Sequence, residues 1–113
     1  MALPEIDRDT LWRRIQEDAI VVVDALGPIS YGAAHLPGAV NIPPERVDDL
    51  AARRIPDRDA EIAVYCANPA CDASVQVAER LVELGYTQVL HYSGGKEDWR
   101  AAGLPLEGSR ART

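Results

Sequence analysis

The sequence predicts one α/β domain with a central parallel β-sheet flanked by helices on both faces. Two apolar runs, 19–24 (AIVVVD) and 61–66 (EIAVYC), are rich in β-branched residues, and the first is continuous, as in strands covered on both sides. Helical patterns alternate with these strands, and right-handed crossovers then place helices on both faces. At 113 residues the chain fits a single domain, 1–107, followed by a tail, 108–113, that we expect to be disordered.

The elements follow in a regular order. A first helix is expected over 10–18 (TLWRRIQED), with Asp9 or Thr10 as its N-cap. The strand 19–24 ends in Asp24 and leads into irregular chain. The later elements are an extended piece over 39–42, a helix over 44–52, a strand over 61–66, a helix over 72–85, a strand over 87–92 and a short helix after Gly94 and Gly95.

Charge and hydropathy exclude several classes of function. The net charge of −6 disfavours binding to nucleic acid or to anionic lipid. The apolar runs are too short to span a bilayer, so we expect no membrane association. The N-terminal residues contain acids and no long apolar stretch, which argues against a secretory signal and for a cytoplasmic protein. In that reducing compartment the two cysteines are expected to be free thiols.

Both cysteines lie at one strand-to-helix turn. Four interpretations are open for this turn: a thiol nucleophile in a backbone anion site, a disulfide, half of a metal site, or a small apolar turn without chemistry. Cys66 ends a central strand, where α/β sheets place their ligand crevice, and it precedes a helix N-terminus. Such a terminus favours an anion and can lower a cysteine pKa. The alternative is a buried, unreactive Cys66 that serves as a small apolar residue.

Cys71 and Asp72 limit the reactions that can be expected at this turn. Cys71 is a candidate resolving thiol that attacks an oxidised or persulfidated Cys66, or else a residue that fills space at the helix start. Two cysteines and two distant histidines do not make a zinc site. A cysteine phosphatase needs arginine six positions after its cysteine, and Asp72 stands there instead. We expect Asp72 to cap the helix.

Three segments resemble the single-domain rhodanese sulfurtransferases over residues 20–106. The segment 31–43 (YGAAHLPGAVNIP) is similar to the family's aromatic-x-x-x-His-Ile-Pro-Gly-Ala-x-x-Ile-Pro pattern. The segment 93–105 (SGGKEDWRAAGLP) is similar to its closing Gly-Gly-x-x-x-Trp-x-x-Ala-Gly-x-Pro signature. The residues VYC, 64–66, stand directly before the position of the active-site loop. The resemblance implies a rhodanese-like fold in which Cys66 carries sulfur as a persulfide.

The expected function is therefore sulfur transfer. Cys66 would take sulfane sulfur from thiosulfate or from a small-molecule or protein persulfide, and pass it to a thiol or cyanide acceptor, with no metal or organic cofactor. The loop backbone is expected to stabilise the persulfide through Ala67, Asn68, Ala70, Cys71 and Asp72. Asp24 is expected to hold loop amides, His35 to act as a structural hydrogen-bonding residue, and His91 to lie at the surface.

The loop also departs from the family pattern. Pro69 replaces a glycine and removes an N–H donor, and Asp72 adds a negative charge beside the anion site. We therefore expect thiosulfate, a small dianion, to bind less well here than in the usual loop of the family, and this longer loop with two cysteines could instead accept sulfur from a protein or low-molecular-weight persulfide. Two alternatives remain: a non-catalytic rhodanese module that binds a partner or senses redox state through Cys66 and Cys71, and a thiol-dependent reductase that uses the same pair.

Overall fold

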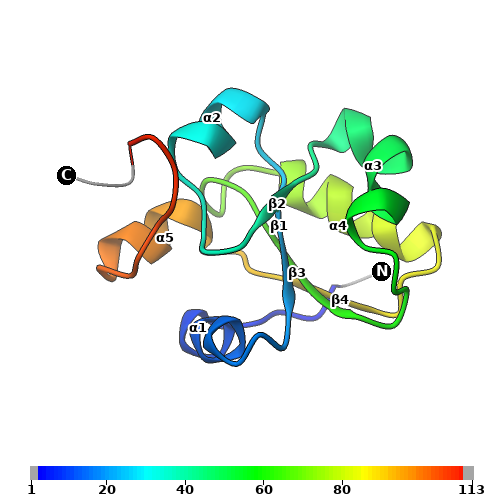
Figure 1. The fold of residues 1–113 in the computed structure, drawn as a ribbon, viewed down its shortest axis with the longest axis horizontal. Coiled ribbons are helices and arrows are strands. Elements are labelled where there is room, and N and C mark those ends of the chain that lie inside the picture. The colour runs from blue at the N-terminus through cyan, green and yellow to red at the C-terminus, as the bar shows by residue number, and fades with distance from the viewer. Residues whose placement is uncertain (1–2, 111–113) are drawn as a thin grey trace.

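The computed structural model describes residues 3–110 and has a four-stranded parallel sheet at its centre (Figure 1). The strands are β1 (Val21–Asp24), β2 (Val40–Asn41), β3 (Glu61–Tyr65) and β4 (Gln88–His91), in the order β2-β1-β3-β4. The helices are α1 (Arg8–Gln16), α2 (Pro28–Ala33), α3 (Val47–Arg54), α4 (Ala73–Glu83) and α5 (Gly95–Ala101), with a 3-10 helix η1 (Pro44–Arg46) before α3. The predicted fold class is confirmed.

The sheet separates two hydrophobic cores. Alternate residues of β3 enter different cores: Ile62 and Val64 pack with α3 and α4, whereas Ala63 and Tyr65 pack with α1 and α5. Trp99 of α5 is fully buried in the second core. Because both faces of the strand are covered, every position needs an apolar side chain, which explains the continuous apolar runs in the sequence.

Helix α1 begins earlier than the sequence suggested. Asp7 is its N-cap, with extended backbone at φ −83° and ψ 164°. The Asp7 carboxylate accepts a hydrogen bond of 2.8 Å from the backbone N–H of Thr10. The prediction of Asp9 or Thr10 as the cap is wrong, because both residues lie inside the first helical turns.

Helix α2 was not predicted. Pro28 occupies its first turn, where the missing N–H is tolerated. The buried side chain of Lys96 closes the other end: its Nζ donates to the carbonyl oxygen of Ser30 at 3.2 Å and to that of Ala34 at 2.7 Å. These contacts come from a residue 62 positions after Ala34, so the local sequence did not reveal them.

The C-terminal residues lie against α2. The backbone N–H groups of Ser109 and Arg110 donate to the carbonyl oxygens of Gly32 and Ala33. Residues 111–113 are outside the described part, so disorder of the tail 108–113 stays a prediction. None of the helices between residues 3 and 110 has the length and apolar character needed to span a bilayer.

Candidate active site

Cys66 follows β3 directly and is 2% exposed. Helix α5 fixes the backbone at this point, because the N–H of Lys96 donates to the carbonyl oxygen of Cys66 and the N–H of Glu97 to that of Ala67, both at 2.9 Å. The loop 66–72 then leads to the start of α4. Cys66 is therefore held at the carboxyl end of a central strand, as predicted. The N–H groups of α5 fix its carbonyl oxygen and that of the next residue, Ala67.

Asn68 organises the rest of the loop. Its Oδ1 accepts from the N–H of Ala70 at 2.9 Å, its carbonyl oxygen accepts from the N–H of Cys71 at 3.1 Å, and its Nδ2 donates to Glu97. Pro69 has no N–H to offer. Two of the amides expected to stabilise a sulfur anion are thus already hydrogen-bonded inside the loop in this structure.

The Cys66 sulfur is surrounded by polar groups although it is buried. Its Sγ lies 3.3 Å from the carbonyl oxygen of Cys71 and 3.2 Å from Oγ of Ser74. Burial raises the pKa of the Cys66 thiol and the side chain of Cys71 raises it further, against the O–H and N–H of Ser74, which lower it. The direction is opposite to the lowering expected from the helix N-terminus.

Cys71 has the opposite character. Partial burial works to raise its pKa, but hydrogen bonds from the Cys66 thiol and from the N–H groups of Ala73 and Ala67 outweigh burial and lower the pKa of Cys71. The Cys71 side chain is also more exposed than that of Cys66. The amides of Ala67 and Ala73 therefore favour a thiolate at Cys71 more than at Cys66.

Asp72 does not cap α4 with its side chain. It occupies the N-cap position, but its backbone, at φ −101° and ψ 0°, lacks the extended conformation that a side-chain cap requires. Its charge instead works to raise the pKa of Cys71. The predicted side-chain capping is wrong.

Ser74 and His91 were not predicted as site residues. Ser74 is 1% exposed, and its Oγ lies 2.8 Å from Nε2 of His91. The His91 side chain is only 12% exposed, and its Nδ1 lies 3.0 Å from Oε2 of Glu5. The prediction of a surface His91 is wrong, because β4 lies beside β3 and pairs His91 with Val64, two positions before Cys66. The sequence offered one signal for this position: neighbouring parallel strands end at the same edge of the sheet, so a histidine at the end of β4 lies near the end of β3.

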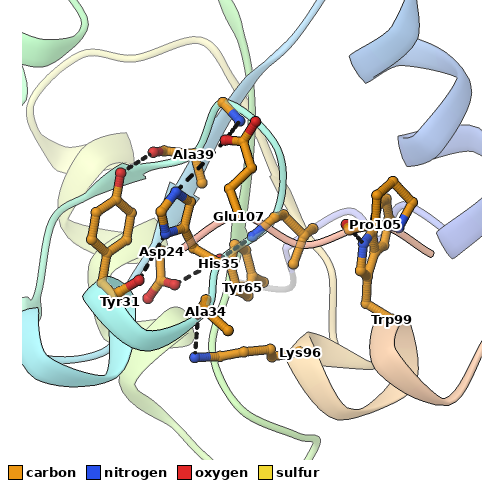
Figure 2. A network of polar contacts seen from close by, with 12 residues as sticks. Asp24, Tyr31, Ala34, His35, Ala39, Tyr65, Lys96, Trp99, Pro105 and Glu107 are labelled. Atoms are coloured by element: carbon orange, nitrogen blue, oxygen red, sulfur yellow. Dashed lines mark hydrogen bonds and ion pairs between the residues drawn. The ribbon is translucent and has the colours of Figure 1, made fainter. Parts of the chain in front are cut away.

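Asp24 and His35 belong to a separate polar network (Figure 2). The buried Asp24 carboxylate accepts from the hydroxyl of Tyr65 at 2.6 Å and, as expected, from a loop amide, the N–H of Leu26, at 2.8 Å. Nδ1 of His35 lies 2.7 Å from the carbonyl oxygen of Tyr31, whose ring stacks on the imidazole. Within residues 3–110 neither side chain hydrogen-bonds to the loop 66–72, so their predicted supporting role at the site stays a prediction.

The fold and this site define a class: a parallel α/β domain with a cysteine at the end of a central strand, on a loop that turns into a helix. Residues 7–102 match the model of the rhodanese-like domain, and the chain belongs to this family. Among residues 3–110 no group of three or more metal-ligating side chains is close enough to hold a metal ion.

Relatives with names include two sulfurtransferases and a regulator. The chain is 37% identical to thiosulfate sulfurtransferase PspE of Escherichia coli over 66% of this chain and 70% of that protein. It is 29% identical to a sulfurtransferase of Allochromatium vinosum over 90% and 92%. It is 34% identical to the HTH-type transcriptional regulator Rv0324 of Mycobacterium tuberculosis over 90% of this chain, but spans only 44% of the regulator.

Solved structures agree with the fold. The BH2092 protein from Bacillus halodurans superposes with a TM-score of 0.87 at 29% identity, covering 95% of this chain and 78% of that chain. A rhodanese with anions from E. coli gives a TM-score of 0.66 at 33% identity, covering 80% of this chain and all of the other, 100%.

Proposed function

We infer that the protein is a rhodanese-type sulfurtransferase that carries sulfane sulfur as a persulfide on Cys66 and passes it to a thiol or cyanide acceptor. One observation carries this proposal: the Cys66 thiol is held at the end of β3, where it donates to Oγ of Ser74 at 3.2 Å, and once Cys66 is ionised the hydroxyl and the N–H of Ser74 favour the thiolate. These two donors are suited to stabilise a sulfur anion at this position. The named relatives support the same class of reaction.

The transfer proceeds in two displacements without a net change in oxidation state. The Cys66 thiolate attacks the outer sulfur of the donor, the donor S–S bond breaks, and a thiolate leaves, or sulfite if the donor is thiosulfate. The acceptor then attacks the outer sulfur of the Cys66 persulfide and releases the Cys66 thiolate. The negative charge of Asp72 beside the site disfavours a dianionic donor, so we expect a persulfide to load Cys66 better than thiosulfate.

Intact mass measures this reaction directly. Wild type, Cys66→Ser and Cys71→Ser are each incubated with thiosulfate and, separately, with glutathione persulfide. We expect a gain of one sulfur atom that is lost in Cys66→Ser, retained in Cys71→Ser and removed by cyanide, with the larger gain from glutathione persulfide. If neither donor adds sulfur to the folded wild type, the sulfurtransferase proposal is wrong and a non-catalytic module takes its place.

A second function, redox sensing, is favoured by the contact between the two cysteines. Sγ of Cys66 lies 3.3 Å from the carbonyl oxygen of Cys71, and the lowered pKa of Cys71 favours the thiolate that attacks an oxidised partner. Peroxide oxidises one thiol to a sulfenic acid, the other sulfur attacks it, and water leaves as the Cys66–Cys71 disulfide forms. In this role Cys71 is the resolving thiol.

Stoichiometric peroxide is therefore expected to give a monomer that has lost two hydrogen atoms, with one peptide linking Cys66 to Cys71. Cys71→Ser should instead accumulate sulfinic acid on Cys66 or form intermolecular dimers, because the resolving sulfur is missing. Peptide mass mapping separates these products. If the wild type itself yields only dimers or sulfinic acid, Cys71 is not a resolving thiol.

A further inference from the structure

A chain of hydrogen bonds leads from the buried Cys66 thiol to the N-terminal segment of the protein. Sγ of Cys66 lies 3.2 Å from Oγ of Ser74, which lies 2.8 Å from Nε2 of His91. Nδ1 of His91 lies 3.0 Å from Oε2 of Glu5. Three elements contribute to this chain besides the loop itself: α4 through Ser74, β4 through His91, and the segment before α1 through Glu5.

The backbone holds Glu5 in place opposite His91. These two residues form a parallel bridge, in which the N–H of His91 donates to the carbonyl oxygen of Pro4 at 2.8 Å and the N–H of Ile6 donates to the carbonyl oxygen of His91 at 3.1 Å. The backbone of Glu5 is thus fixed beside His91 by main-chain hydrogen bonds on both sides of it, and this places the Glu5 side chain within reach of the imidazole.

The hydrogen bonds have one consistent direction when Glu5 is ionised and the thiol is protonated. A carboxylate only accepts, so Nδ1 of His91 carries the hydrogen and Nε2 is free to accept from the hydroxyl of Ser74. The Ser74 oxygen then accepts from the Cys66 thiol. The thiol of Cys66 thus donates to Ser74, Ser74 to His91, and His91 to Glu5. The chain ends at the basic imidazole nitrogen and the Glu5 carboxylate.

We propose that His91 accepts the Cys66 proton through Ser74, and that Glu5 orients the imidazole and stabilises its charged form. The proton on Sγ moves to Oγ of Ser74 while the hydroxyl proton of Ser74 moves to Nε2 of His91, so one proton leaves sulfur and one arrives at nitrogen. The products are a Cys66 thiolate and an imidazolium beside the Glu5 carboxylate. This inference rests on the proposed function, because the thiolate is the form that attacks the donor.

The surroundings of Cys66 and His91 make such an acceptor useful. Burial raises the pKa of the Cys66 thiol, so the resting thiol does not ionise easily by itself. Facing His91 are Glu5 from the N-terminal segment and, through Ser74, the thiol of Cys66, while the strand neighbour Val64 is apolar. In this relay His91 is a positioning residue, since Ser74, not His91, contacts the reacting sulfur.

The test is the pH dependence of Cys66 alkylation by iodoacetamide, measured in a Cys71→Ser background so that one thiol is read without a coupled neighbour. At neutral pH, Cys66 in His91→Gln should be alkylated about tenfold more slowly. This factor is the decrease in thiolate fraction when the pKa of the Cys66 thiol rises by one unit. Glu5→Gln should show a smaller decrease. At alkaline pH, where hydroxide removes the proton, all rates should converge. Glu107→Gln is the matched control and should follow the parent curve, because Glu107 pairs with the other histidine and not with the relay.

A purely structural role predicts a different pattern, in which the variants lose the same fraction of rate at every pH and unfold at lower temperature. That pattern, or unchanged curves, would overturn the relay. If His91→Gln does not fold, the Glu5→Gln curve decides alone, since Glu5 is exposed. The assay uses no sulfur donor. Sulfur loading with an unchanged alkylation curve therefore refutes only the relay, and a shifted curve without sulfur loading refutes only sulfur transfer.

Discussion

Replacing Gly95 with alanine is expected to destabilise the protein by about 3 kcal/mol and to abolish sulfur loading of Cys66. Gly95 has φ +70°, and a Cβ there would lie 2.6 Å from the carbonyl oxygen of Cys66 and 2.8 Å from that of Ala67. Both oxygens accept hydrogen bonds from the start of α5, so the backbone cannot move aside without losing them. The clash therefore acts on the part of the chain that fixes the reactive cysteine.

Gly103→Ala is the control that distinguishes the effect of the steric clash at Gly95 from the effect of a left-handed backbone conformation. Gly103 has nearly the same conformation, φ +74°, but a Cβ there would meet no atom within 4 Å. Its substitution should destabilise by about 1 kcal/mol, from the left-handed conformation alone, and leave sulfur loading intact. Urea unfolding gives both free energies and intact mass gives the loading. Equal free energies for the two variants would show that the loop yields to the added methyl group and does not need Gly95.

The sequence predicted the strands well because their signal is local. A central strand covered on both faces needs apolar residues at every position, and the runs that form β1 and β3 meet this need directly. The turn that carries Cys66 was also predictable, since a strand followed by a helix pattern fixes where the carboxyl end lies. These features depend on residues next to one another in the chain.

Features that depend on distant residues were missed. Helix α2 is completed by Lys96, which the local pattern around Pro28 does not include. The position of His91 depends on the pairing of β4 with β3 and on the segment around Glu5, 86 positions away. A histidine near a strand end has no sequence signal that distinguishes an exposed side chain from one packed beside a buried serine.

The sign of the Cys66 pKa shift was missed for a related reason. A helix N-terminus predicts a lowered pKa, but burial opposes it, and the degree of burial is decided by tertiary packing. The backbone N–H groups of the loop are also not all directed at Cys66. Those of Ala70 and Cys71 donate to Asn68, and those of Ala67 and Ala73 donate to the Cys71 sulfur. The motif located the reactive turn correctly, whereas the distribution of hydrogen bonds within it required the structure.

The second large effect is expected for Tyr65→Phe, which removes a hydroxyl that joins β1, β3 and the segment after α2. The Tyr65 hydroxyl donates to Oδ2 of Asp24 at 2.6 Å and accepts from the N–H of Leu36 at 3.0 Å (Figure 2). Phenylalanine leaves a buried carboxylate oxygen and a buried N–H without these partners. The expected loss of stability is about 3 kcal/mol at neutral pH, measured by urea unfolding.

This loss should depend on pH in a defined direction. Burial raises the pKa of Asp24 above 3.8, and the Tyr65 hydrogen bond works against that rise. Removing the hydroxyl therefore raises the Asp24 pKa further in the folded state only. A group that binds its proton more tightly when folded contributes less stability as the pH rises through its folded pKa. The difference between wild type and Tyr65→Phe should be largest at neutral pH and narrow as the pH falls through the Asp24 pKa.

Tyr86→Phe is the matched control for the pH dependence. Tyr86 is also buried, but its hydroxyl donates to the carbonyl oxygen of Ile55 at 2.6 Å, a partner that does not titrate. Its removal should destabilise by about 1 kcal/mol, equally at each pH. If Tyr65→Phe shows the same flat dependence, Asp24 does not ionise in the folded protein, and the hydroxyl acts only as a neutral hydrogen-bond partner. A difference that grows with pH for Tyr65→Phe alone assigns the effect to the Asp24 carboxylate, because no other titrating side chain accepts the Tyr65 hydroxyl within residues 3–110.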